Sequence, residues 1–298
     1  MKNLSFYEQK GLEGEKIFEY FIASMRPSIA GWDYFVDWSK VRREAKKYTD
    51  ELNLLNGLIG SQDLRADFLR LLQKYPSVVM AFPTLIAVRD RVVLVSEIKN
   101  EELFTNSYVF NTKEKLSSPE DYWHFFKESG LSSLIESKEL KSLTDYVFGV
   151  EVGLDTNGRK NRGGDAMENI VESFLKPFCE SRGFRYITEA NAYKIKRELG
   201  YIVPVDKSSR RYDFVIDTRS EPVLIETNFY GGGGSKLKST AGEYRNLYDV
   251  LNGKFKFIWI TDGAGWRKTQ LPLRETFEHN DYVFNLSMLS DGVLETVF

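Results

Sequence analysis

The chain has 298 residues, of which 42% are hydrophobic and 28% are charged, and its formal net charge is −2. This length is enough for one large domain or two, and the composition is that of an ordinary globular protein. The single cysteine excludes a disulfide framework and favours the cytoplasm, and the two histidines lack the spacing of a zinc site or a catalytic triad. No apolar run approaches the roughly 20 residues of a membrane span, so we expect no membrane partner.

The first part of the chain, residues 1–145, is predicted to be mainly helical. Apolar residues recur at helical spacing in three segments, 15–25, 41–58 and 62–72. A strand is predicted for 92–98, and Ser117-Ser118-Pro119-Glu120 is typical of a helix start. The pattern changes near residue 145, where we place a boundary with a second domain, 146–298.

The second part alternates helices and strands. Residues 147–152 fit a strand or the end of a helix, and the Gly- and Asn-rich segment 154–164 is predicted to be a loop. The elements expected after it are a helix at 165–178, two strands joined by a turn, a glycine run at 231–234, a helix at 235–251 and a strand at 255–261. This order predicts an α/β fold with a mixed sheet, because the last strand can lie parallel to a hairpin strand through a helical crossover.

The two strands before the glycine run each carry an acid within an apolar segment. They are Arg210–Asp217 and Leu224–Asn228, and the turn between them contains Pro222. If the turn is symmetric about residues 219 and 220, Asp213 faces Glu226 with both side chains on one face. Burial of an unpaired carboxylate is costly, so the pair predicts a divalent-metal site in preference to two acids that face water.

Basic residues cluster in the predicted loop before the helix at 165–178. Arg159, Lys160 and Arg162 with free N–H groups at a helix start would suit phosphate, although a solvated loop is the alternative. Asp165 and Glu168 fit a capping box at that helix start. The glycine run lacks the order G-x-x-x-x-G-K-[ST], which argues against nucleotide hydrolysis. It permits a close backbone approach or a tight turn.

The order of elements and acids resembles the PD-(D/E)XK nuclease superfamily. The resemblance implies that Asp213 and Glu226 hold one or two Mg²⁺ ions with the main-chain carbonyl of Thr227, and that Glu168 is an extra acid. Asn228 stands where the superfamily usually has lysine; its amide can orient water or phosphate but cannot take a proton. Lys236, at the start of the next helix, is a candidate for the missing cation, and an exposed surface lysine is the alternative.

A denser resemblance covers roughly residues 140–275. The matching segments are 143–162, 164–171, 212–216, 225–230, 234–237 and 259–263, and they are similar to the DpnII/MboI family of type II restriction endonucleases. Glu-x-Asn at 226–228 is also what that family shows. The resemblance implies Mg²⁺-dependent double-strand cleavage of unmethylated 5′-GATC-3′ before the G, leaving 5′ overhangs. It also implies a homodimer acting on a palindrome and a cognate adenine methyltransferase as functional partner.

The resemblance assigns a role to each part of the chain. Residues 146–298 would be the catalytic domain, and residues 1–145 would bind DNA or dimerise. The residues expected to contact DNA are Arg159, Lys160, Arg162, Lys236 and Lys238. Two alternatives stay open from the residues alone: a structure-specific repair or recombination nuclease of the same superfamily, and a non-catalytic DNA-binding protein.

Overall fold

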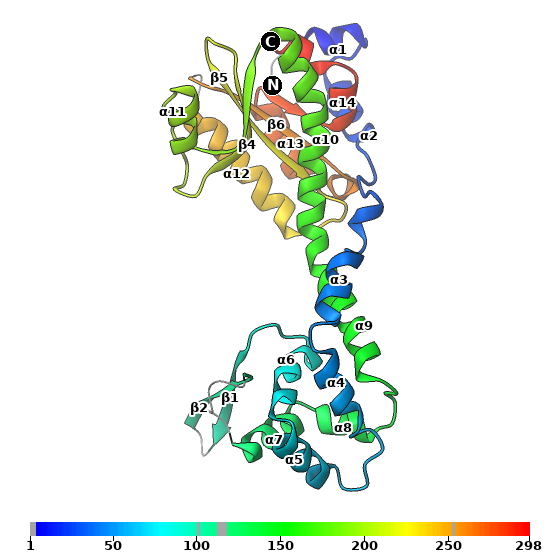
Figure 1. The fold of residues 1–298 in the computed structure, drawn as a ribbon. Coiled ribbons are helices and arrows are strands. Elements are labelled where there is room, and N and C mark those ends of the chain that lie inside the picture. Colours follow the sequence, from blue (N-terminus) through cyan, green and yellow to red (C-terminus); the bar gives the residue numbers. More distant parts are fainter. Residues whose placement is uncertain (1–3, 100–101, 112–117, 252–253) are drawn as a thin grey trace. The chain divides into compact units, whose positions relative to one another are not determined.

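The computed structural model of the protein describes residues 4–99, 102–111, 118–251 and 254–298 (Figure 1). The chain forms two compact units. One is residues 33–159, called the helical unit below, and the other combines residues up to 32 with 160–298 and is called the sheet unit. The boundary predicted at 145/146 falls inside helix α9 (Leu143–Asp155). In the described ranges no helix is long and apolar enough to span a membrane.

The helical unit packs short helices around one apolar core. Its elements are η1 (Trp32–Tyr34), α3 (Trp38–Ala45), α4 (Thr49–Asn56), α5 (Leu64–Lys74), η2 (Pro76–Ala81), α6 (Phe82–Leu85), β1 (Val92–Lys99), β2 (Glu102–Val109), α7 (Pro119–Glu128), α8 (Leu131–Glu136), α9 and η3 (Thr156–Gly158). The rings of Phe68, Phe82 and Phe126 meet at the centre of the core. The predicted helix start is confirmed at Ser118, which caps α7, whereas Ser117 lies outside the described residues.

The sheet unit contains a five-stranded mixed sheet, which confirms the predicted α/β class. The strand order is β3 (Arg185–Asn191), β4 (Arg211–Asp217), β5 (Pro222–Phe229), β6 (Lys256–Asp262) and β7 (Tyr282–Phe284). The first two pairings are antiparallel and the last two are parallel. Helix α12 (Ser235–Leu251) makes the predicted crossover from β5 to β6 (Figure 1).

Further helices pack with this sheet in the same unit. The N-terminal segment is connected to strand β6 by a hydrogen bond to Asp262. The helices are α1 (Ser5–Gln9), α2 (Glu15–Ala23), α10 (Arg159–Arg182), α11 (Ala192–Leu199), η4 (Ala264–Lys268), α13 (Gln270–His279), α14 (Leu286–Ser290) and η5 (Val293–Thr296). The fully buried carboxylate of Asp262 accepts bonds from the N–H groups of Arg26, Gly263 and Leu286. One acid thereby joins three distant segments of the chain.

The predicted loop at 154–164 is wrong, because this segment is helical. Helix α9 continues through η3 into α10, so Arg159, Lys160 and Arg162 lie in the first turn of α10. Asp165 therefore lies inside a helix, and the predicted capping box is also wrong. Glycine costs only about 1 kcal/mol in a helix, so packing of the long flanking helices can override the local composition.

The backbone of the glycine run is closely approached by the turn after β6, and this approach depends on Gly263 and Gly265. Gly265 N–H donates to the carbonyl of Tyr230 at 2.8 Å, so the turn after β6 lies against the turn after β5. A Cβ atom at Gly263 would lie 2.2 Å from the Tyr230 oxygen, and one at Gly265 would lie 2.4 Å from the Gly232 oxygen. Only glycine fits at these two positions without moving the backbone.

Candidate active site

The hairpin of β4 and β5 has the predicted register. Phe214 pairs with Ile225, and the pairing continues to Asp217 and Pro222 around a turn in which Arg219 has a φ of +70°. Extending this register by one residue sets Asp213 opposite Glu226. The interiors of both strands are buried, as their apolar sequences indicate. The two acids therefore lie directly beyond the last paired residues of a buried hairpin.

Asp213 binds the neighbouring strand through one oxygen. Its Oδ2 accepts from the N–H of Thr227 at 2.7 Å and from the Thr227 hydroxyl at 2.9 Å. Burial raises the pKa of Asp213, and the two bonds from Thr227 partly oppose that rise. None of the described groups donates to Oδ1, so this oxygen is available to a further ligand.

Glu226 is only 5% exposed and has a donor on each oxygen. Arg210 Nη1 donates to Oε1 at 3.0 Å, and the Tyr244 hydroxyl donates to Oε2 at 3.1 Å. Burial, followed by the negative charge of Asp213, raises the pKa of Glu226 to about 8, while the Arg210 charge opposes the rise. Both donors leave lone pairs on the carboxylate, because each oxygen can accept more than one bond.

Arg210 is itself held by two further acids. Asp206 accepts from Nε at 2.8 Å and from Nη2 at 2.6 Å, and Glu243 accepts from Nη2 at 2.6 Å. The guanidinium also lies 5.8 Å from the centre of the Tyr244 ring. Such a fork of bonds fixes the orientation of the cation as well as its charge. Arg210 thus presents Nη1 to Glu226 from a rigid support.

The amide of Asn228 bridges two aromatic side chains. Its Oδ1 accepts from the Trp259 indole at 2.6 Å, and its Nδ2 donates to the Tyr244 hydroxyl at 3.2 Å. Because Tyr244 in turn donates to Glu226, a continuous chain of bonds connects Trp259 with the carboxylate. The amide is well suited to this place because it offers one acceptor and one donor at once. A lysine there could not accept from the indole.

Two more acids, Glu168 and Glu189, interact with Asp213 through their charges. Glu168 is half-buried on α10, and burial, then the charges of Asp213 and Glu189, raises its pKa to about 7. Glu189 lies on β3, where the pairing with β4 skips it between Thr188 and Ala190. Its φ is +46°, a left-handed conformation that is unusual for a non-glycine residue, and its carboxylate lies 3.4 Å from Arg211.

The described contacts of the predicted basic residues do not include the acids of the hairpin. Lys236 and Lys238 are exposed on α12, and among the described residues neither forms an ion pair. Arg159 Nε donates to the carbonyl of Phe35 at 3.1 Å within the helical unit. Arg162 is half-buried, and nothing is described of the Lys160 side chain. The structure thus brings together Asp213, Glu226, Thr227, Asn228 and Glu168, and none of the described contacts joins Arg159, Lys236 or Lys238 to these acids.

The sequence interpretation missed the groups that support Glu226. Tyr244 follows Leu237 and Ala241 at helical spacing on the buried face of α12, so its periodicity was a usable signal. Arg210 directly precedes the strand that carries Asp213, but nothing local shows that its partners are Asp206 and Glu243. Glu189 had no signal, because its importance depends on the pairing of β3 with β4.

The donor set suits a hard divalent cation. In the described ranges no group of three or more His, Cys, Asp or Glu side chains forms a cage for a metal. Mg²⁺ does not require one, because it is commonly held by one or two carboxylates, waters and substrate phosphate. Asp213 and Glu226 supply such oxygens, and their buried negative charges would be relieved by a cation. The residues present therefore fit Mg²⁺.

Comparison with known proteins identifies the family. The sequence profile described as DpnII restriction endonuclease matches residues 17–296. The chain belongs to the DpnII restriction endonuclease family. It is therefore a type II site-specific deoxyribonuclease, which hydrolyses phosphodiester bonds in DNA.

Relatives match this chain along nearly its whole length. It is 43% identical over 288 residues to the type II restriction enzyme MjaIII of Methanocaldococcus jannaschii, covering 94% of this chain and 98% of the relative. It is 38% identical to DpnII of Streptococcus pneumoniae, covering 94% and 98%. It is 35% identical to MboI of Moraxella bovis, covering 93% and 98%. The resemblance to the DpnII/MboI family is confirmed.

Proposed function

We propose that this restriction endonuclease cleaves both strands of unmethylated 5′-GATC-3′ before the G, with Mg²⁺ as cofactor, and leaves 5′ overhangs. It would act in the cytoplasm as a homodimer, beside an adenine methyltransferase that protects the same site in host DNA. The observation that carries the proposal is the identity of 38% and 35% to the enzymes DpnII and MboI along almost their whole lengths. The arrangement of Asp213 and Glu226 supports a PD-(D/E)XK catalytic core.

In this proposal the acids of the hairpin hold the ion. Asp213 through its available Oδ1, Glu226 and the carbonyl of Thr227 would be the protein ligands. When bound, Mg²⁺ lowers the pKa of a water and offsets negative charge on the phosphate. Arg210 and Tyr244 orient the Glu226 carboxylate by the two bonds described above. Asn228 holds Tyr244 in place, so we assign it a positioning role.

Glu168 is a candidate for proton exchange. Its pKa of about 7 means that both protonation states of its carboxyl group are populated near neutral pH. It lies close enough to Asp213 for the charge of one to raise the pKa of the other. We propose that the Glu168 carboxylate accepts a proton from a water near Asp213. Arg159, Lys160, Arg162, Lys236 and Lys238 are proposed to contact DNA phosphates.

Plasmid digestion tests the specificity. Plasmid DNA prepared with and without adenine methylation at GATC would be incubated with the enzyme in Mg²⁺ or in EDTA. Discrete GATC fragments are expected only from unmethylated DNA with Mg²⁺, and end sequencing should place the cut before the G. Cleavage that ignores methylation would favour the structure-specific nuclease, and uncut DNA with Mg²⁺ would contradict the proposal.

Substitution of the acids tests the metal assignment. Asp213→Ala and Glu226→Ala should abolish cleavage and leave DNA binding largely intact, because neither acid attracts the phosphate backbone. Glu221→Ala is the matched control, since Glu221 is a half-buried acid at the turn end of the same hairpin, where it pairs with Lys256. Near wild-type cleavage by either site variant would show that the ligands are assigned wrongly.

A further inference from the structure

Positive charge is concentrated on a short segment of the helical unit. Residues 38–48, which contain α3, include five basic residues and one acid, although the whole chain has a net charge of −2. A nearly neutral protein that gathers cations on one element has a local potential very different from its average. Some of these cations face solvent, and others form ion pairs within the fold.

The cations of α3 divide into an anchored and an exposed set. Val41 and Ala45 are buried, whereas Arg42, Arg43 and Lys46 are exposed at positions that share one side of the helix. On the inner side, Lys40 Nζ lies 3.8 Å from the buried carboxylate of Asp155. In the described part of the chain, no acid pairs with Arg42 or Lys46, while Glu44 accepts from Arg43 at 3.3 Å.

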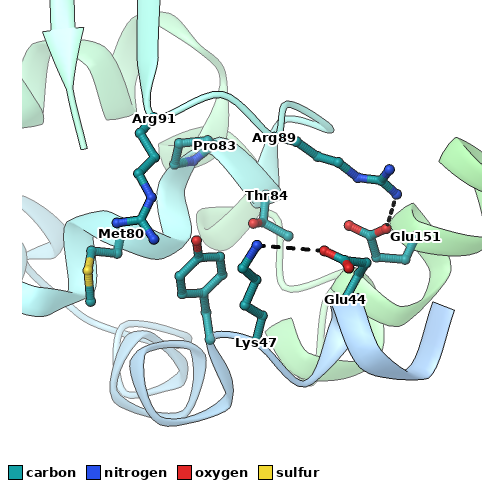
Figure 2. Close-up of a pocket in the computed structure, with 9 residues that line it drawn as sticks. Glu44, Lys47, Met80, Pro83, Thr84, Arg89, Arg91 and Glu151 are labelled. Atoms are coloured by element: carbon teal, nitrogen blue, oxygen red, sulfur yellow. Dashed lines mark hydrogen bonds and ion pairs between the residues drawn. The ribbon is translucent and has the colours of Figure 1, made fainter. Parts of the chain in front are cut away.

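Further cations from the segment before β1 surround a hollow beside α3. Figure 2 shows Arg91 and Lys47 among the side chains that line this hollow, and Lys47 directed toward Glu44, 3.7 Å away. Arg89 points to Glu151, which is 4% exposed and 2.5 Å away. Arg91 is exposed and has no ion pair among the described residues. The buried acids thus hold Arg89 and Lys40. Glu44 pairs with both Arg43 and Lys47, and Arg42, Lys46 and Arg91 have no ion pair among the described residues.

The hollow is too small to enclose a nucleotide. Its volume is about 20 Å³, which is room for one water-sized group. Single oxygens on a larger polyanion can approach such a surface, and exposed arginines and lysines spaced along a helix are suited to successive backbone phosphates. We infer that Arg42, Arg43, Lys46, Lys47 and Arg91, together named the α3 surface, bind the phosphate backbone of duplex DNA. The inference rests on the proposed function only in taking duplex DNA as the substrate.

A backbone contact of this kind has a measurable signature. Neutralising a side chain that contacts one phosphate lowers the slope of log affinity against log salt concentration by about 0.9. The variant Arg42→Gln/Arg43→Gln/Lys46→Gln should therefore lose about 2 to 3 from that slope and on the order of tenfold or more in affinity at low salt. The loss should be equal for duplexes with and without GATC, because phosphates carry no sequence information.

The measurement is fluorescence anisotropy of short duplexes with the full-length protein in EDTA over a series of salt concentrations. The matched control, Arg65→Gln/Arg70→Gln/Lys127→Gln, removes three exposed positive charges from α5 and α7 of the same unit. It should keep the wild-type slope. Lys47→Gln/Arg91→Gln is an independent variant around the hollow and should lose about 2 from the slope. Circular dichroism melting confirms that each variant is folded.

Three results would overturn the inference. The first is an unchanged salt slope in both surface variants, and the second is an equal decrease of the slope in the control variant. The third is a loss of affinity restricted to GATC duplexes, which would indicate base recognition. Sedimentation of the DNA-free protein adds a fourth: a wild-type dimer that becomes monomeric in the surface variants would make this a subunit interface. If wild-type protein cuts plasmid at GATC while binding is unaffected by the variants, only the α3 surface fails. If the slope falls but GATC is not cut, only the proposed specificity fails.

Discussion

Arg210 donates from Nη1 to Oε1 of Glu226 at 3.0 Å, and the side chains are only 4% and 6% exposed. A buried cation therefore lies beside the acid of the Glu-x-Asn segment, although Asn228 holds the position at which the resemblance to the PD-(D/E)XK superfamily leads us to expect lysine. The cation comes from Arg210, directly before β4, instead of from the second residue after Glu226 on β5. Its geometry is set by Asp206 and Glu243, so it is a fixed charge in the site.

Arg210→Met should destabilise the protein by about 3–5 kcal/mol, because it leaves buried Glu226 without its counter-charge. Arg211→Met is the control at the adjacent position, where an exposed pair with Glu189 contributes about 1 kcal/mol or less. Urea unfolding monitored by circular dichroism measures both. Arg210→Lys should recover stability only in part, since an ammonium cannot reproduce the fork to Asp206. Equal effects of Arg210→Met and Arg211→Met would contradict this role.

Asn228→Lys should lower cleavage even though it introduces the lysine that is usual in the PD-(D/E)XK superfamily, to which the proposed catalytic core would belong. The substitution removes the acceptor for the Trp259 indole and the donor to Tyr244, at a cost of about 1–3 kcal/mol for the unsatisfied buried group. Single-turnover cleavage rates and tryptophan fluorescence would be compared with wild type. Faster cleavage in Asn228→Lys would show that a cation at this position is what the reaction lacks.

The stability of the metal-free protein should fall as pH rises. Glu226 and Glu168 have pKa values of about 8 and about 7 in the fold, above the ordinary 4.5. An acid with a raised pKa stabilises the fold fully below its unfolded pKa, and this contribution is lost as pH rises through the folded value. Melting temperatures in EDTA should therefore decline more steeply from about pH 5 to about pH 9 in wild type than in Glu226→Gln.

Mg²⁺ should reverse this decline. A cation competes with protons for the same carboxylates, so the rise in melting temperature on adding Mg²⁺ should be larger at about pH 9 than at about pH 6. Glu226→Gln should weaken the Mg²⁺ effect at every pH, which calorimetric titration of the ion can verify without DNA. A Mg²⁺ effect of the same size in this variant would place the ion elsewhere.

Glu189→Gly should stabilise the fold and reduce cleavage. Glycine relieves the left-handed backbone at φ +46°, which costs on the order of 1 kcal/mol or more for other residues. It also removes a negative charge that raises the pKa values of Asp213 and Glu168. Lys138→Gly is the control, because Lys138 has a φ of +57° in the helical unit. It should gain similar stability without a change in cleavage; the idea is falsified if both variants cleave equally well.

The hairpin was predictable from local pattern alone. The continuous apolar segments and the turn around Arg219 are short-range features, and they predict the register that sets Asp213 opposite Glu226. Helix α12 and strand β6 were predictable for the same reason, since each has a long uninterrupted pattern. Local composition was misleading at 154–164, where the burial of apolar residues from α9 and α10, each within its own unit, overrides weak glycine preferences.

The sequence by itself therefore determined the class of fold, the pair of acids and the family. Those properties depend on residues that are neighbours along the chain or across one tight turn. The tertiary structure decided what surrounds the acids: Arg210 with its supports, Tyr244 from α12, Glu168 from α10 and Glu189 from β3. These groups meet through the pairing and packing of elements far apart in the chain, which set burial and charge together. No local spacing encodes that combination, and it is what raises the pKa of Glu226 and fixes its carboxylate.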